Sequence, residues 1–134
     1  MPGNTTGASQ ITMEATADFR TTQYGGVFMN TAGLAAMITD PDTIVQEPLG
    51  VLYNNPNIGQ NALIRKFDGN GKITVNAGEA ISIGDWITLS TSGMAITTAA
   101  VGQWVVGRAE TAAGAAGERI TMISGAVHRV NSLG

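Results

Sequence analysis

The chain contains no cysteine and few charged or aromatic residues. Of its 134 residues, 13% are charged and 5% are aromatic. The absence of cysteine excludes disulfides, thiolate metal ligands and thiol nucleophiles. The charged fraction is about half of the roughly 25% that soluble domains average. This shortage has two interpretations: a surface that partners cover in the working state, or an ordinary sheet surface rich in threonine, serine and asparagine.

An excess of basic charge and long apolar runs are also missing, and we expect no secretory signal. The formal net charge is -3, whereas a general nucleic-acid binder needs a basic face. The longest apolar runs are far too short to cross a bilayer. The first residues, MPGNTTGASQ, have neither the basic nor the apolar region of a secretory signal. We therefore expect no nucleic-acid or membrane partner, and assembly in a cytoplasm.

Short apolar segments separated by glycine dominate the C-terminal part of the chain. Apolar and polar residues alternate in ISI at 81–83, ITL at 87–89 and ITM at 120–122. A period of two with β-branched residues is typical of half-buried strands. Gly84-Asp85 between two of these segments indicates a turn. The length suits one domain with its own core, so we predict an all-β protein with a small β-barrel or β-tulip-like domain.

The N-terminal residues differ from the rest of the chain. Residues 1–19 are polar and irregular, and neither a period of 2 nor one of 3.6 holds there. We therefore predict an extended N-terminal arm over 1–19, followed by a single β-domain over 20–134.

Two further segments give specific local predictions. LAAMI at 34–38 fits either a short helical turn or a strand, and it ends before a proline, which disfavours helix in the residue preceding it. Residues 62–67 and 73–75 read as two strands that return on each other around the DGNG turn at 68–71.

A weak internal repeat is visible in the pattern of glycines. Two stretches share the order strand, loop of small residues, glycine followed by a polar residue, and strand. Chance agreement between glycine-rich loops is the alternative explanation. The first stretch runs from GVL at 50–52 through Gly59 to ALI at 62–64, and the second from GRA at 107–109 through Gly117 to ITM at 120–122.

The DGNG turn matches the middle of a calcium-binding EF-hand loop, but its ends do not. Such a loop needs an oxygen ligand at its first position and a bidentate glutamate at its twelfth. These positions hold Lys66 and Ala77, and Glu79 comes two residues late. We therefore interpret the segment as a glycine-rich turn without a metal.

The remaining candidates for chemistry are few. His128 is the only histidine, and no carboxylate lies close to it in sequence, so we interpret it as a surface residue. Asp40, Asp42 and Glu47 gather around two prolines, which is typical of a solvated turn. No glycine-rich phosphate-binding motif is present. We therefore predict a protein that is not an enzyme and that needs no cofactor or metal.

Three aromatic residues are candidates for a contact surface. Tyr53, Trp86 and Trp104 each lie in or beside an apolar strand segment. Such residues belong either to a core or to an interface. Aromatic rings can also stack on sugars or bases, so glycan binding remains an alternative.

Several segments together resemble the capsid decoration, or cement, proteins of tailed bacteriophages. These patterns of glycine and apolar residues recur in the same order in that family, and the similarity covers about residues 45–127. The segments are GVLYNNPNIGQ at 50–60, GEAI at 78–81 with Gly84-Asp85, and VGRA at 106–109 with AGE at 116–118.

The resemblance implies a structural protein of the virion. Family members are typically small β-barrel or β-tulip folds on the outer capsid surface, often as trimers, where they clamp neighbouring major-capsid subunits and stabilise the expanded shell. Their N-terminal arms often add a strand to the capsid. By this resemblance the partner is the major capsid protein, and the arm contacts are Thr5, Thr6, Ile11, Met13 and Phe19.

Two other classes of function remain open at this stage. One is a phage tail or fibre accessory, or a glycan-binding β-module that uses Tyr53, Trp86 or Trp104. The other is a small hydrolase, which would require carboxylates or His128 to converge in a cleft.

Overall fold

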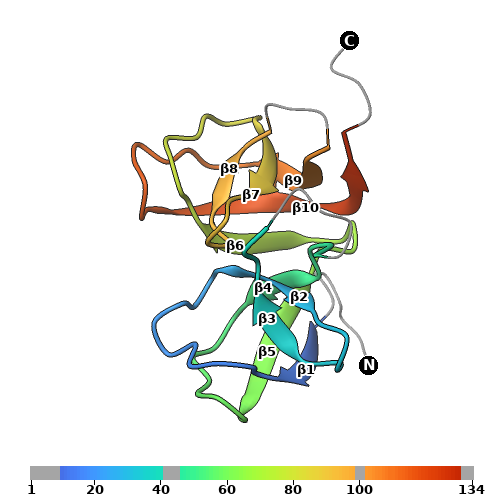
Figure 1. Cartoon of the computed structure of the whole chain (residues 1–134). Helices are drawn as coiled ribbons and strands as arrows, with labels where there is room; N and C mark the ends of the chain where they lie inside the picture. The colour runs from blue at the N-terminus through green and yellow to red at the C-terminus, as the bar shows by residue number, and fades with distance from the viewer. Residues whose placement is uncertain (1–9, 41–45, 99–101, 131–134) are drawn as a thin grey trace, which may run out of the picture.

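The computed structural model describes residues 10–40, 46–98 and 102–130, and in these residues the protein is all-β, as predicted (Figure 1). Every regular element of the described residues is a strand. The strands are β1 Gln10–Glu14, β2 Gly26–Met29, β3 Ala35–Met37, β4 Gly50–Leu52, β5 Asn61–Lys66, β6 Lys72–Asn76, β7 Trp86–Leu89, β8 Ala95–Thr97, β9 Trp104–Ala109 and β10 Arg119–Arg129.

The strands form two five-stranded antiparallel sheets with the same topology. The first sheet has the order β1-β5-β4-β2-β3, and the second has the order β6-β10-β9-β7-β8. Each strand of the first sheet therefore corresponds to the strand five places later. The described strands form two five-stranded sheets rather than one closed barrel, which corrects the prediction of a single barrel. An isolated bridge brings the two edge strands of each sheet together, Ala15 with Ala35 and Ala77 with Ala95. Figure 1 shows the two sheets stacked, with β6 at the level where they meet.

The repeat predicted from the glycines therefore extends over all ten strands of the described residues. We call residues 10–66 the first half and residues 72–129 the second half. Gly50 of β4 is paired with Val27 of β2, and Gly107 of β9 is paired in the same way with Ile87 of β7. These registers define counterpart residues in the two halves, such as Gly50 and Gly107.

The loops repeat as closely as the strands. The Gly59 N–H donates to the Ala15 carbonyl at 3.0 Å, and the Gly117 N–H donates to the Ala77 carbonyl at 2.8 Å. Both glycines adopt positive φ, 79° and 93°, a conformation that L side chains rarely adopt. This explains why glycine recurs in the loop that precedes the last strand of each half.

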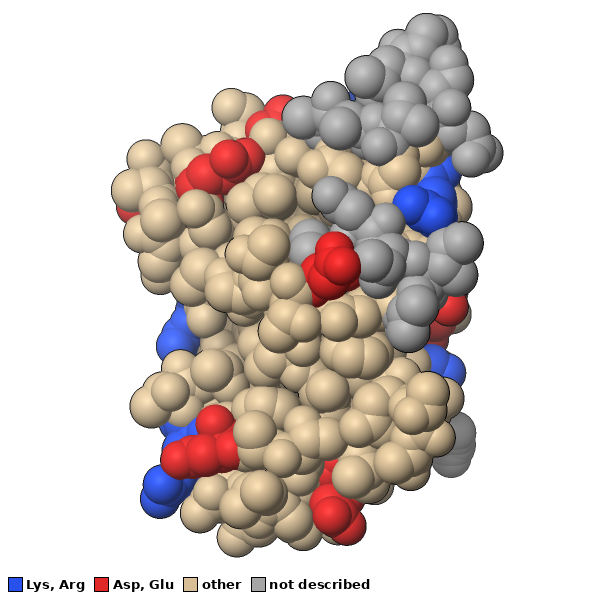
Figure 2. Space-filling view, viewed as in Figure 1, with Lys and Arg blue, Asp and Glu red and all other residues tan. Residues whose placement is uncertain are grey.

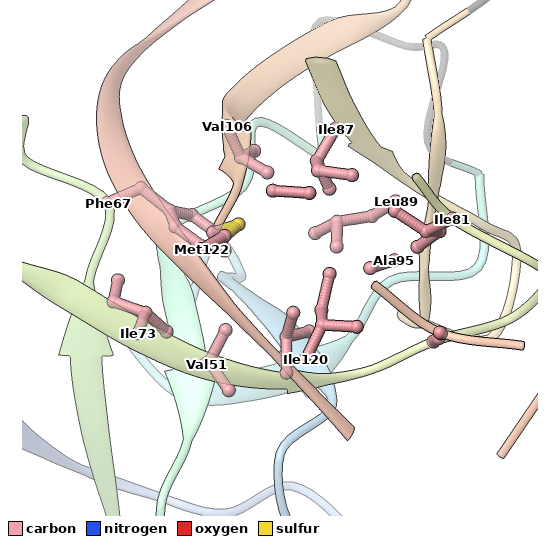
Figure 3. Packing of buried hydrophobic residues seen from close by; sticks show 14 of the residues in the cluster. Val51, Phe67, Ile73, Ile81, Ile87, Leu89, Ala95, Val106, Ile120 and Met122 are labelled. Carbon is pink, nitrogen blue, oxygen red and sulfur yellow. The ribbon is translucent and has the colours of Figure 1, made fainter. Parts of the chain in front are cut away.

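Each half encloses an apolar core, and the larger core draws on both halves. The first-half core contains Ala15, Phe19, Val27, Ala35, Leu52, Ala62 and Ile64. The second-half core includes Ile73, Ile87, Val106, Ile120 and Met122, and it also takes in Ile38, Val51 and Phe67 from outside that half. Figure 3 shows Val51 beside Ile73 and Ile120. The halves are therefore fused through shared apolar packing, the dominant favourable term in folding.

The predicted N-terminal arm is wrong for residues 10–19. Gln10 to Glu14 form β1, which pairs with β5 over its whole length. Ala15 follows in the first-half core, and Phe19 is 3% exposed there. These residues belong to the fold because their alternate apolar side chains complete the first core. Residues 1–9, the rest of the predicted arm, lie outside the described residues.

Two local predictions are resolved by the topology. LAAMI at 34–38 contains β3 and is a strand, not a helical turn. The DGNG turn at 68–71 is present, with Gly69 and Gly71 at positive φ. The strands beside it do not form the predicted hairpin, since β5 and β6 belong to different sheets. The turn therefore connects the two halves.

Glu79 ties the end of β6 to β8 and gives the fold a small acid sensitivity. Its carboxylate accepts the Thr97 N–H at 2.9 Å and the Thr97 hydroxyl at 2.7 Å. These hydrogen bonds, the backbone one first, lower the pKa of Glu79 below its usual value. A lowered folded-state pKa means that the stabilisation is present at neutral pH and is lost as the pH falls through that pKa.

We expect Glu79→Gln to lower the free energy of unfolding by less than about 1 kcal/mol at pH 7, because the site is exposed. The difference from the wild type should shrink as the pH falls from the usual glutamate pKa through the lowered native pKa of Glu79, where the native carboxylate becomes protonated. Urea unfolding of both proteins between pH 7 and pH 3 checks this. A difference that does not change with pH would show that the ionised carboxylate contributes nothing.

Candidate interaction surface

The described residues offer little for catalysis or metal binding. No group of three or more histidine and acidic side chains in this part of the chain is placed to hold a metal ion. His128 is exposed near the end of β10, and Asp40 and Glu47 are exposed on either side of residues 41–45. Asp42 lies outside the described residues. The described part of the chain also contains no helix that could span a membrane.

The residues predicted as arm contacts lie in different environments. Thr5 and Thr6 lie outside the described residues. Ile11 and Met13 are half-buried on β1 and pack against the first-half core. Phe19 is part of that core, so its side chain is not available to a partner. The three described residues of this set, Ile11, Met13 and Phe19, therefore pack into or against the first-half core and do not form one exposed surface.

The three aromatic candidates also separate. Trp104 is 8% exposed, with the Arg129 guanidinium 5.4 Å from its ring centroid. Tyr53 is half-buried, and its hydroxyl accepts the Thr74 N–H at 2.7 Å. Trp86 is 52% exposed on β7. Of the three, only Trp86 presents most of its side chain at the surface.

Trp86 belongs to a row of exposed side chains that crosses three neighbouring strands. Arg108 of β9 is paired with Trp86 of β7 on one side and with Ile123 of β10 on the other. Ile83, which is 71% exposed, lies in the turn before β7. We call these four residues the outer row: Ile83, Trp86, Arg108 and Ile123.

The outer row is held in place by contacts of Arg108. Its guanidinium carbon lies 4.9 Å from the centroid of the Trp86 ring, close enough for a cation–π interaction. Its Nε donates to the Gly84 carbonyl at 2.8 Å. These contacts cover one face of the indole and fix the arginine. They leave Ile83 and Ile123, which is 50% exposed, without an apolar cover.

The alternation of the strands explains why the row points outward. Ile87, Ala109 and Met122, each next in sequence to a residue of the row, are buried in the second-half core. Because successive side chains of a strand point to opposite faces, Trp86 and Ile123 must point away from that core. The sequence analysis missed Arg108 and Ile123. The sequence held one signal for Ile123. It is apolar and directly follows the apolar Met122, and in a strand two adjacent residues point to opposite faces, so one of the two points outward.

The face of the molecule drawn in Figure 2 has little charge. Figure 2 shows scattered acidic and basic side chains on one face, with uncharged residues over most of it. Tryptophan and arginine side chains that lie together are characteristic of the cores of protein interfaces. The outer row is therefore the best candidate for an interaction surface among the described residues.

Comparison with known proteins shows a similarity of fold to a solved structure. No protein-family model matches the chain, and no curated protein matches it. Among solved structures, the fold is similar to that of the head fiber gp8.5 N base of bacteriophage phi29, with a TM-score of 0.66. The alignment has 19% sequence identity and covers 87% of this chain and 92% of that chain. At this identity the similarity shows a shared all-β fold.

Proposed function

We propose that this chain is a structural protein of a bacteriophage head with no catalytic role. The observation that carries the proposal is the fold similarity to the phi29 head fiber base, which extends over 87% of this chain. The phage-like segments between residues 50 and 118 support the same assignment independently, since they were identified from the sequence. The low charge and the exposed outer row agree with a protein that works through its surfaces.

In this proposal the protein binds the outer surface of the head and clamps neighbouring major-capsid subunits, in trimers as in the family that it resembles. Residues 1–9 would pair with a capsid strand, because main-chain hydrogen bonds give affinity without special side chains. Many copies on a lattice would add their contacts, so that a modest affinity at each site still reinforces the shell.

The test is co-sedimentation of the purified protein with undecorated, expanded heads, with bound copies counted per capsid subunit. We expect saturation at a fixed symmetric ratio. Deletion of residues 2–9 should weaken binding at least about tenfold, which corresponds to about 1.4 kcal/mol. The deletion stops before β1, so the near-native thermal unfolding that we expect of it serves as a control for folding. A deletion that reached Phe19 would remove part of the core.

Two outcomes would contradict the proposal. Absence of binding by the full chain at high micromolar concentration would remove the head-binding role. Normal binding by the deletion variant would remove the role of residues 1–9 alone. Retention that depends on a sugar would instead favour the glycan-binding alternative, for which Trp86 is the remaining exposed aromatic candidate.

A further inference from the structure

The two halves pack against each other with different faces. The first half contributes the start of β2 and the residues just before it. The Tyr24 carbonyl accepts the Asn76 N–H at 3.1 Å, and the Gly26 N–H donates to the Gly93 carbonyl at 2.7 Å. Val51 adds its side chain to the second-half core. We call this set the receiving face: Gln23, Tyr24, Gly26, Val51, Tyr53 and Arg65.

The second half contributes an edge strand and a hairpin end. From β6, Asn76 Nδ2 donates to the Gln23 carbonyl at 2.9 Å, and the Lys72 carbonyl accepts from Arg65 Nη2 at 3.4 Å. From the β7–β8 hairpin, Leu89 and Gly93 contact Gly26. We call residues 72–76 and 89–93 the inserting edge.

Because the halves are repeats, each face has a counterpart in the other half. The strand registers match Gly26 to Trp86, Val51 to Arg108 and Arg65 to Ile123. The hydrogen bonds of the turns before β2 and β7 extend this match. The Tyr24 N–H donates to the Leu52 carbonyl, and the Gly84 N–H donates to the Ala109 carbonyl, so Tyr24 corresponds to Gly84 and Gln23 to Ile83. The outer row therefore consists of the counterparts of Gln23, Gly26, Val51 and Arg65 of the receiving face.

The counterpart of the inserting edge is also exposed. Residues 29–33 of the first half correspond to residues 89–93, with Met29 in the place of Leu89. Met29 is 55% exposed, whereas Leu89 is 1% exposed. The described residues include five exposed large apolar side chains. Four of them belong to these two free faces: Met29, Ile83, Trp86 and Ile123.

We propose that the outer row of one copy binds the β2–β3 hairpin end, residues 29–33, of a second copy. The two halves of one chain pack head to tail, and the proposed contact would repeat this arrangement between two chains. Such a contact is heterologous, because it uses a different surface on each partner. Repetition of a heterologous contact gives a closed ring or an open filament, depending on the rotation between copies.

The large and small residues exchange sides between the internal contact and the proposed contact between copies. Inside the chain the receiving face has the small Gly26, whereas the outer row has the large Trp86 at the corresponding position. A Cβ at Gly26 would lie 2.5 Å from Leu89 Cδ1, so the internal contact needs glycine on the receiving face. Trp86 in that place prevents the same close approach between copies. The other partner has a hollow of about 270 Å³ lined by Phe28, Met29, Asn30 and Thr31. A cavity of roughly 150 Å³ holds a benzene ring, so this hollow has room for the Trp86 indole.

The composition of the outer row suits a small, energetically concentrated contact. Tryptophan and arginine are the side chains most enriched among residues that dominate binding energy. Arg108 already lies over the Trp86 ring, so these two side chains lose little conformational entropy on binding. The hollow adjoining Met29 would cover the apolar surface that the structure leaves in water.

Sedimentation velocity of the purified protein without heads tests the inference, from low micromolar to near-millimolar concentration. We expect concentration-dependent self-association. Trp86→Ser and Ile123→Ser should each weaken it at least about tenfold, in line with hot-spot losses above 1 kcal/mol. Ile58→Ser is the matched control: Ile58 is 65% exposed and belongs to neither face. It should associate as the wild type does.

A mixing experiment tests the head-to-tail arrangement itself. Trp86→Ser and Met29→Asp should each sediment as monomers when alone. An equimolar mixture should form dimers, since the intact Trp86 of one variant can meet the intact Met29 of the other. A mixture that remains monomeric although the wild type associates would overturn the head-to-tail contact. A wild type that is monomeric throughout, or an Ile58→Ser variant as weak as Trp86→Ser, would overturn the whole inference. Heads are absent from these experiments, so their failure leaves the proposed head binding untested and intact.

Discussion

Replacing either Gly50 or Gly107 by alanine should destabilise the fold by about 3 kcal/mol, the cost expected when an atom is forced into closely packed structure. A Cβ at Gly50 would lie 2.2 Å from the Arg65 carbonyl oxygen. A Cβ at Gly107 would lie 2.4 Å from the Ile123 carbonyl oxygen. In both cases the obstacle is backbone of the neighbouring strand, so relief requires the strands to separate and their hydrogen bonds to lengthen. Urea unfolding monitored by circular dichroism measures the loss.

Gly114 provides the control for these two glycines. It has no positive φ, and the nearest atom to its hypothetical Cβ is the flexible carboxylate of Glu118 at 3.4 Å. Gly114→Ala should therefore change stability by no more than about 0.5 kcal/mol. If the variants at Gly50 and Gly107 were as stable as this control, the close approach of β4 to β5 and of β9 to β10 would be refuted.

The same two glycines show how much of the repeat is readable in the sequence. Gly50 and Gly107 each begin one of the two stretches that the sequence analysis aligned, and the structure places them at equivalent points of equivalent sheets. Their conservation between the halves follows from the lack of space for a side chain. The positions of the glycines therefore predicted the repeat correctly, because the lack of space for a side chain acts on each half separately.

The partition into two sheets could not be predicted in the same way. The DGNG turn at 68–71 has the residues of a tight turn, and a tight turn usually returns a strand on itself. Here the next strand pairs instead with β10, some fifty residues later in the chain. Local residue preferences fix the turn but not the partner of the strand that follows, since pairing is decided by long-range burial.

The error at residues 10–19 has a similar origin. Ile11 and Met13 alternate with polar residues in β1, but two apolar residues are too few to establish a period of two. Phe19 enters the core after an irregular turn that carries no periodic signal. A short strand at the edge of a sheet is stabilised by its partner β5, and that partner cannot be seen in the local sequence.

The outer row was partly predictable. Trp86 was identified as a candidate, yet Trp86 and Trp104 are both followed by β-branched residues, and the sequence does not tell which one is buried. The difference lies in the pairing: Trp104 is paired with Arg129 of β10 and is buried, whereas Trp86 is paired with Arg108 and is exposed at the start of β7. Arg108 and Ile123 join Trp86 only when the pairing of three strands is known.

Exchanging the residues at one pair of counterpart positions should cost much more stability in the first half than in the second. Val51 is fully buried and belongs to the second-half core. Val51→Arg would place a guanidinium among Ile73, Ile120 and other apolar side chains. An unpaired buried charge costs at least several kcal/mol, so we expect a loss of about 4 kcal/mol or more, which is comparable to the whole stability of many domains.

The reverse exchange, Arg108→Val, should be tolerated. It removes the contact with the Trp86 ring, worth about 0.5–1 kcal/mol at an exposed site, and the hydrogen bond to the Gly84 carbonyl. Valine suits an exposed strand position, so the net loss should stay near about 1 kcal/mol. Thermal unfolding of both variants gives the comparison. If Val51→Arg does not fold, Val51→Ala measures the same site through a loss of about 1–3 kcal/mol.

The asymmetry between the two exchanges follows from the head-to-tail packing of the halves. Val51 and Arg108 occupy equivalent places in the repeat and pair with equivalent strands. They differ in what covers them. The second half covers Val51, whereas within the described residues no third unit covers Arg108. A small loss for Val51→Arg, equal to that for Arg108→Val, would mean that the halves do not bury this face against each other. A large loss at Val51 alone would establish that the duplicated fold has one filled and one open receiving face.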